Sequence, residues 1–309
     1  MKINNKYFKL GLFFLLISIG ITGCKSNKDT VNNKIALEEW SSLFNGKDLK
    51  GWDIKFTGEE LNENYKNTFV AEDGMLRIKY DEYTEFNDNF GHLYYKNPFS
   101  YYKLSFDYRF VGKQTKGGAN SNHRNSGVML HSQSAESNEF DQKFPVSVEL
   151  QLLGGLEDHK ARPTANVCTP GTVIVTGDKI NYKHCVSSSS KTYYGDQWVH
   201  AEAIVLGGES MTFIVENDTV LKFKMPQIGS LDKTKNYRGE NWKKWKINKE
   251  VWSSKTGDIL DEGYIALQAE SHPIDFKNLK ILDLCGCKDP KAKNYKSYYV
   301  KDKPKSCVY

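Results

Sequence analysis

The chain has 309 residues, of which 39% are hydrophobic and 13% aromatic, and its formal net charge is +5 at pH 7. Aromatic residues set among many Gly, Asn and Ser turn residues favour an all-β protein. The charge is modest and forms no clustered basic face, so nucleic acid is not expected as a partner.

The N-terminus has the layout of a secretory signal. Three lysines precede an apolar stretch over residues 10–21, which is too short to span a bilayer. The Ile-Thr-Gly-Cys ending at 21–24 resembles a bacterial lipobox. This resemblance implies cleavage after residues 1–23, lipidation of Cys24, and an exported protein anchored by lipid to a bacterial membrane. Residues 24–39 are polar and read as a tether between the membrane and the folded domain.

Beyond residue 40, short alternating runs separated by turn residues predict strands. Residues 69–80 predict a hairpin around Asp73-Gly74, residues 197–225 predict three strands, and residues 263–284 predict a final strand pair. About ten or more such strands, with no normal-length amphipathic helix, indicate a sandwich of two antiparallel sheets. A span of 40–284 is suitable for one such domain.

Residues 123–155 hold two alternating runs whose faces differ sharply. In the second run, Val148 and Leu150 share an apolar face, while Glu149 and Gln151 share the opposite one. Strict alternation is typical of half-buried strands. The polar face is either ordinary solvated surface or the floor of a binding groove.

Three other runs repeat this design. Together the four runs supply carboxylates, amides, imidazoles and a guanidinium: Asp107 and Arg109; Asn125 and His131; Glu149 and Gln151; and Gln268, Glu270 and His272. Such groups suit a polyhydroxylated carbohydrate ligand, whose hydroxyls both donate and accept hydrogen bonds. We therefore predict that the four polar faces line one groove, although each face alone is equally typical of an exposed strand.

The basic segment 230–258 interrupts the strand pattern and carries three tryptophans. It is either a short amphipathic helix or an ordered loop. Its aromatic and cationic residues either help bind sugar or form an insertion that packs its own tryptophans.

Five cysteines remain after Cys24, in a protein predicted to be exported, where disulfides persist. Cys168 and Cys185 flank the hairpin-like segment 166–186 and are expected to pair. Among Cys285, Cys287 and Cys307, two are expected to form a disulfide, which leaves the third as a free thiol. A zinc site is disfavoured, because CGC spacing is tight and no second CxxC or HxxxH accompanies it.

A family resemblance rests on six segments in order: SLFNGKDLKGW, HRNSGVMLH, VSVELQLLGG, NVCTPGT, HCVSSSSKTYYGDQWV and GYIALQAESHPIDFKNLKILDL. They resemble the DUF1080 family, also called the 3-keto-disaccharide hydrolase domain. The resemblance implies a concanavalin-like jelly-roll sandwich and hydrolysis of oxidised sugars. Some members have His-Gly where this chain has Glu270-Ser271, so a role assigned to that histidine does not carry over.

The C-terminal residues 285–309 resemble a short Cys-bounded repeat, GCxDPxAxNY…C. This resemblance implies a disulfide between Cys287 and Cys307 and leaves Cys285 odd. Related repeats are usually acidic, whereas this copy is rich in lysine, which disfavours a calcium site.

In a 3-keto-glycoside the ketone acidifies the C2 proton, and the glycosidic oxygen on C1 lies β to the ketone. Elimination then needs a base, an electrophile for the enolate oxygen and an acid for the leaving group. Glu149 is the first candidate for the base and Glu270 the second. Arg109 or His131 would stabilise the oxyanion, and His272 or His131 would protonate the leaving oxygen.

The remaining predicted contacts are to the sugar: Asn125, Gln151 and Gln268 would orient its hydroxyls. The His and Glu content permits a divalent metal in place of Arg109 without requiring one. Two alternatives remain: a two-carboxylate glycosidase using Glu149 and Glu270, and a non-catalytic carbohydrate-binding module with the same groove.

Overall fold

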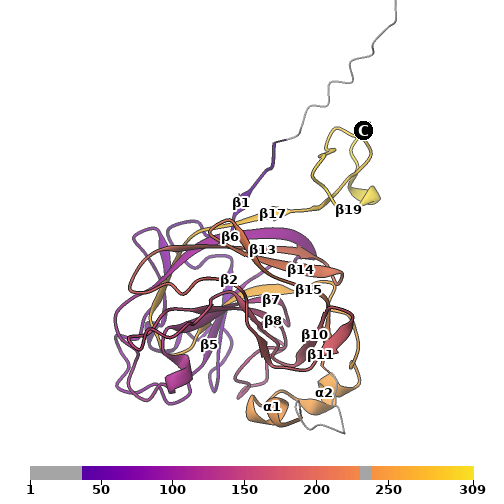
Figure 1. Cartoon of the computed structure of the whole chain (residues 1–309). Coiled ribbons are helices and arrows are strands. Elements are labelled where there is room, and N and C mark those ends of the chain that lie inside the picture. The colour runs from indigo at the N-terminus through magenta and orange to yellow at the C-terminus, as the bar shows by residue number, and fades with distance from the viewer. Residues whose placement is uncertain (1–36, 230–238) are drawn as a thin grey trace, which may run out of the picture. The chain divides into compact units, whose positions relative to one another are not determined.

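The computed structural model describes residues 37–229 and 239–309, and two large antiparallel sheets dominate it (Figure 1). The ten-stranded sheet runs, in spatial order, through β11 (Lys179–Asn181), β10 (Thr172–Thr176), β15 (Asp218–Ile228), β14 (Ser210–Val215), β13 (Val199–Leu206), β6 (Tyr101–Phe110), β17 (Ile274–Asp283), β4 (Met75–Ile78) and β3 (Phe69–Glu72), with β1 (Ser41–Ser42) paired to β17. The seven-stranded sheet runs through β12 (Cys185–Val186), β9 (Asn166–Cys168), β8 (Val148–Leu153), β7 (Asn125–Ser132), β16 (Tyr264–Ala269), β5 (Gly91–Tyr95) and β2 (Trp52–Phe56). The predicted all-β sandwich of two antiparallel sheets is confirmed.

Alternation along the strands builds the core between the sheets. In β6, Leu104 and Phe106 are fully buried, whereas the intervening Ser105 is only partly covered. On the other sheet, Leu150 of β8 and Leu267 of β16 are buried in the same apolar cluster. Burying side chains of this size stabilises the fold by about 1.5–3 kcal/mol each.

The predicted hairpin at 69–80 is present as β3 and β4, with Asp73 and Gly74 both at positive φ in the turn. The three strands predicted at 197–225 are β13, β14 and β15. The strand pair predicted at 263–284 is wrong in its pairing. β16 joins the seven-stranded sheet and β17 the ten-stranded one, so the chain crosses between layers at 270–273.

The segment 166–186 also divides between the sheets. Its ends, β9 and β12, pair with each other, and Cys168 and Cys185 lie in register and form a disulfide. Its middle forms β10 and β11 on the other sheet.

Two short helices lie within the basic segment: α1 (Gly239–Lys244) and α2 (Lys249–Ser253). The side chain of Asn248 caps α2 by accepting hydrogen bonds from the backbone N–H groups of Glu250 and Val251. Trp242 and Trp245 are buried against Val146. The segment therefore packs its tryptophans onto the sandwich.

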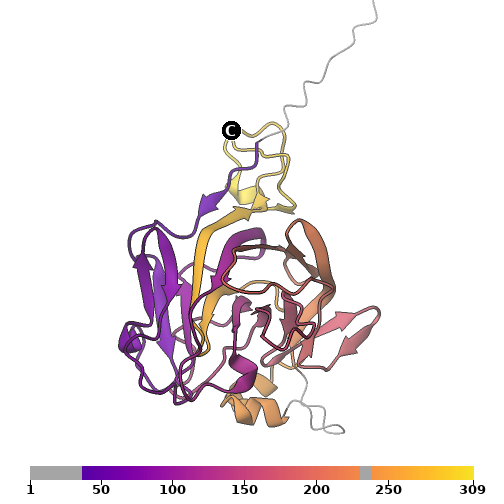
Figure 2. The same cartoon turned by 60° about the vertical axis from the view of Figure 1, so that its left-hand side comes forward.

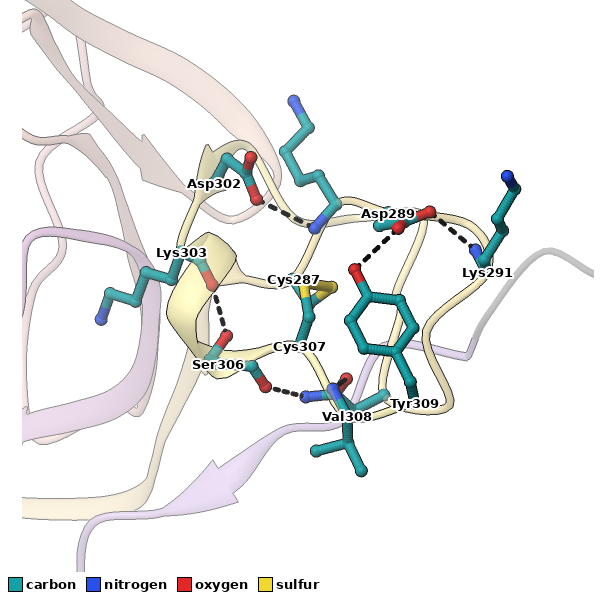
Figure 3. The surroundings of a disulfide bond; sticks show 11 residues. Cys287, Asp289, Lys291, Asp302, Lys303, Ser306, Cys307, Val308 and Tyr309 are labelled. Atoms are coloured by element: carbon teal, nitrogen blue, oxygen red, sulfur yellow. Dashed lines mark hydrogen bonds between the residues drawn. A yellow bond between two sulfur atoms is a disulfide. The ribbon is translucent and has the colours of Figure 1, made fainter.

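The C-terminal tail, residues 285–309, is a small closed unit (Figure 3). β18 (Cys285–Gly286) and β19 (Lys301–Asp302) pair in parallel, a 3-10 turn follows at Pro304–Ser306, and a disulfide joins Cys287 to Cys307. Cys285 is buried as a free thiol. Two further 3-10 turns are Tyr65–Asn67 and Asn120–Asn122.

Residues 36–309 form one compact unit. The tail lies at one end of it, next to β1, and the two helices lie at the other end (Figures 1 and 2). Within the described part of the chain, no helix is long and apolar enough to cross a membrane. The predicted signal, Cys24 and most of the tether fall within residues 1–36, outside the described residues.

Candidate functional site

A band of polar side chains crosses the face of the seven-stranded sheet that points away from the core. Gln151 lies in register with Asn166 on one side and with Gly127 on the other. Farther along, Gln268 lies in register with His92. The band therefore spans β9, β8, β7, β16 and β5.

A cavity of about 350 Å³ lies over this face. Its strand residues are Asn125 of β7, Glu149 and Gln151 of β8, and Cys185 of β12, and Glu270 follows directly after β16. Loops and α1 supply most of the remaining walls, with Phe90, Ser121, Asn122, Phe144, His184, Lys244 and Trp245. The structure thus brings together four of the nine candidate catalytic and substrate-binding residues.

Trp245 is the aromatic wall of the cavity. Its ring centroid lies 4.4 Å from that of His184 and 5.7 Å from that of Phe144. The basic segment therefore packs its tryptophans, as one of the two alternatives predicted, and it also lines the cavity.

Glu149 is a buried carboxyl on the cavity wall. It is 5% exposed, and burial raises the pKa of its carboxyl to about 8. Among the described residues, none is found hydrogen-bonded to this carboxylate. The side chain lies over Gly127, where an added Cβ would come within 2.5 Å of Oε1.

Glu270 is the second buried carboxyl of the cavity. Its pKa is raised well above the ordinary value, first by burial and then by the charge of Glu149. Arg162 and Lys244 act in the opposite direction. Like charges in one site cannot both ionise easily, so the pair holds its second proton more tightly than its first.

Arg162 is a cation that no sequence pattern marks, because it lies in an irregular segment. Its guanidinium donates to the carbonyl oxygens of Arg124 at 3.0 Å and Gly154 at 2.6 Å. These contacts fix its position near Glu270 without neutralising its charge.

Several buried polar atoms on this face have no hydrogen-bond partner among the described residues. They are Oδ1 of Asn125, both amide atoms of Gln268 and Nε2 of His92. Burial also lowers the pKa of His92 to about 3, which keeps the ring neutral. Unsatisfied buried groups are rare and costly, so this cluster indicates a site completed by water or by a hydroxyl-rich ligand.

Asp107 and Arg109 do not belong to the cavity, and their predicted place in the groove is wrong. Both lie on β6, on the outer face of the ten-stranded sheet, with the core between them and the cavity. Arg109 forms an ion pair with Asp275 at 2.9 Å and lies over the Trp198 ring. Asp107 contacts His200 at 2.7 Å.

His131 is also misplaced by the prediction. Its backbone has φ of 45°, which breaks the alternation of β7. Nδ1 lies 2.8 Å from the carbonyl oxygen of Leu260 and Nε2 lies 3.2 Å from that of Ser100. The ring is buried beside Tyr102, away from the residues that line the cavity.

His272 is buried outside the cavity lining, at the crossover between the sheets. Its ring packs against Phe110 and His123, with centroid separations of 5.6 Å and 5.3 Å. The positive φ of Ser271 ends the alternation that would have placed His272 beside Glu270. Burial lowers the pKa of His272 to about 3, so it is not a proton donor near neutral pH.

The structure offers little for a thiolate-bound metal. Over residues 37–229 and 239–309, one set of three candidate ligands lies close together: Cys168, His184 and Cys185. Its cysteines are joined in a disulfide, which leaves no thiolate to bind an ion.

Comparison with known proteins adds the family. A structure from Parabacteroides distasonis, described as a candidate glycosyl hydrolase, is 17% identical over 79% of this chain and 93% of its own, with a TM-score of 0.43. A Bacillus subtilis protein of unknown function with a galectin-like fold is 10% identical over 76% of this chain and 90% of its own, with a TM-score of 0.44. Carbohydrate binding module CBM66 from Bacillus subtilis is 8% identical over 79% of this chain and 94% of its own, with a TM-score of 0.37.

No curated protein matches this chain. The model of one family, described as the 3-keto-alpha-glucoside-1,2-lyase-like domain, matches residues 39–282. The matched region includes both sheets and every residue on the cavity wall. The chain therefore belongs to the 3-keto-alpha-glucoside-1,2-lyase-like domain family.

Proposed function

We propose that this protein cleaves the glycosidic bond of 3-keto-disaccharides or related oxidised glycosides in the cavity beside β8 and β16. The observation that carries the proposal is a pair of buried carboxyls, Glu149 and Glu270, with raised pKa values in a member of this family. Two carboxyls that ionise in sequence can act as base and acid in the same reaction.

In the proposed reaction, ionised Glu149 removes the proton from C2 of the keto sugar. The enolate then forms a C1–C2 double bond, and the C1–oxygen bond breaks. Protonated Glu270 gives its proton to the departing oxygen. Water next adds to C1 as Glu270 takes its proton, and Glu149 returns the first proton to C2. Both carboxyls are restored, and the net reaction is hydrolysis.

Residues on the cavity wall and close behind it have supporting roles. Lys244 and Arg162 provide positive charge that would stabilise the enolate oxygen, the role first given to Arg109. Asn125 and Gln268 have unsatisfied polar atoms that would bind sugar hydroxyls. The ring of Trp245 would pack on the apolar face of the sugar.

Glu149→Gln should lower kcat by about 10²–10⁴-fold while leaving the fold intact, because the amide cannot accept the C2 proton. The assay compares a 3-keto-disaccharide with its unoxidised parent. Cleavage of the keto sugar alone fits the proposal, whereas cleavage of both points to a two-carboxylate glycosidase. If the wild-type chain binds the sugar but cleaves neither compound, the protein is a non-catalytic carbohydrate-binding module.

The rate should depend on pH through Glu149. Because the base must be ionised and its pKa is about 8, kcat/KM should rise about tenfold per pH unit below pH 8. It should fall again at higher pH as Glu270 loses its proton. A flat profile from pH 5 to 9 would contradict this assignment.

The pH dependence of unfolding provides an independent test of the raised pKa of Glu149. Between the ordinary pKa of 4.5 and the folded value of about 8, the native state keeps a proton on Glu149 that the unfolded chain releases. The free energy of unfolding should therefore fall as pH rises across this window. Urea unfolding of Glu149→Gln should show a smaller fall.

Gly127→Ala should displace the Glu149 carboxylate, because the new Cβ would lie within 2.5 Å of Oε1. We expect kcat to fall by about 10²-fold, in keeping with the loss when a catalytic group moves by about 1 Å. Gly177→Ala is the matched control, since a Cβ there meets no atom within 4 Å although its positive φ adds strain. Full activity of Gly127→Ala would show that the position of this carboxylate does not matter.

We further propose that the protein works outside the cytoplasm on a lipid anchor at Cys24. The signal layout of residues 1–23 and the two disulfides support this. In a bacterial host, Cys24→Ser should move the protein from the membrane fraction to the soluble exported fraction. Equal membrane association of both forms would refute the anchor.

A further inference from the structure

The C-terminal tail is fastened to the sandwich beside the first strand. The backbone N–H of Val300 donates to the carbonyl of Leu284 at 2.8 Å, and Lys296 forms an ion pair with Glu39. The disulfide between Cys287 and Cys307 closes the tail on itself (Figure 3). The tail therefore presents a fixed surface to the neighbouring end of the domain.

A cleft of about 380 Å³ lies where the tail meets the sandwich. Tyr95 and Phe99 form one part of its lining, and Tyr298 and Tyr299 of the tail form another. This volume falls in the range of about 300–1,000 Å³ that is typical of small-molecule sites. The cleft shares no lining residue with the cavity that contains Glu149.

The rings that line the cleft are held in place. Tyr95 and Phe99 stack with centroids 5.9 Å apart and an interplanar angle of 22°. Tyr299 lies against Gly286, where an added Cβ would come 2.2 Å from its ring. Because Gly286 has no side chain, the Tyr299 ring can occupy this position.

The polar groups that line the cleft can accept and donate hydrogen bonds, and together they carry no large net charge. Asn97 is exposed, Glu39 is ion-paired with Lys296, and Asp283 accepts a hydrogen bond from the backbone of Cys285. The tail carries seven lysines against two aspartates, so its field opposes a cationic ligand. The carboxylates in the lining oppose an anionic one.

We propose that this cleft is a second ligand site, which binds a neutral oligosaccharide between the tail and the sandwich. Aromatic faces suit the apolar faces of sugar rings, and the amide and carboxylates at the edge suit hydroxyls. The proposal does not depend on the reaction assigned to Glu149 and Glu270. It gives the tail a role in holding a carbohydrate while the cavity at the other end remains accessible.

The test uses the full folded chain with maltohexaose, cellohexaose and xylohexaose, each titrated by calorimetry. At least one should bind, and Tyr299→Ala and Asn97→Ala should each weaken that binding by about tenfold or more. Tyr299→Phe is the matched control and should stay within about threefold, because it keeps the ring. Turnover of a 3-keto-disaccharide should not change in Tyr299→Ala.

A second measurement on the unmutated chain guards against misfolded variants. Tyrosine rings labelled with ¹³C should show shifts at Tyr95 and Tyr299 when the bound hexaose is added. The proposal is overturned if none of the three sugars binds. It is also overturned if binding is lost in Trp245→Ala but kept in Tyr299→Ala, since the sugar would then occupy only the other cavity. Failure of the reaction proposed for Glu149 would leave these binding results unaffected.

Discussion

The sandwich is stable because its long strands turn most of their apolar side chains toward one shared core, and this constraint also decides where the polar side chains go. Once Leu150 is buried between the sheets, Glu149 and Gln151 must lie on the opposite face. On most strands such a face would be open to water. Here the loops and α1 cover it, so the same alternation that builds the core also places a buried carboxyl in a cavity.

Local pattern was sufficient for much of the fold and for part of the site. Strict alternation identified β7 and β8, and with them Asn125, Glu149 and Gln151. It could not say which sheet a strand joins, because that depends on pairing with strands far away in the sequence. For this reason Arg109 was assigned to the wrong layer, although its outward direction on β6 was predicted correctly.

The wrong predictions for His131 and His272 arise from the conformation of the backbone. Period-two reasoning assumes an extended backbone at every step, and positive φ values at His131 and Ser271 break that assumption. Loop residues escape the pattern altogether. Arg162 and Lys244 come from irregular or helical segments, so no strand periodicity marks them. Only the folded chain places these two cations near Glu270.

The disulfide between Cys168 and Cys185 has a consequence for the state in which the cavity is complete. Cys185 and the adjacent His184 lie on the cavity wall, and the disulfide ties this edge to β9, next to β8 and Glu149. β12 is only two residues long and pairs with β9 alone. The adjacent His184 accepts hydrogen bonds from Thr169 and packs against Trp245, and Val186 packs against the core. The position of this wall is thus set jointly by a covalent bond, by hydrogen bonds from Thr169 and by the ring of Trp245, so the cavity beside the buried carboxyls is bounded by three kinds of contact.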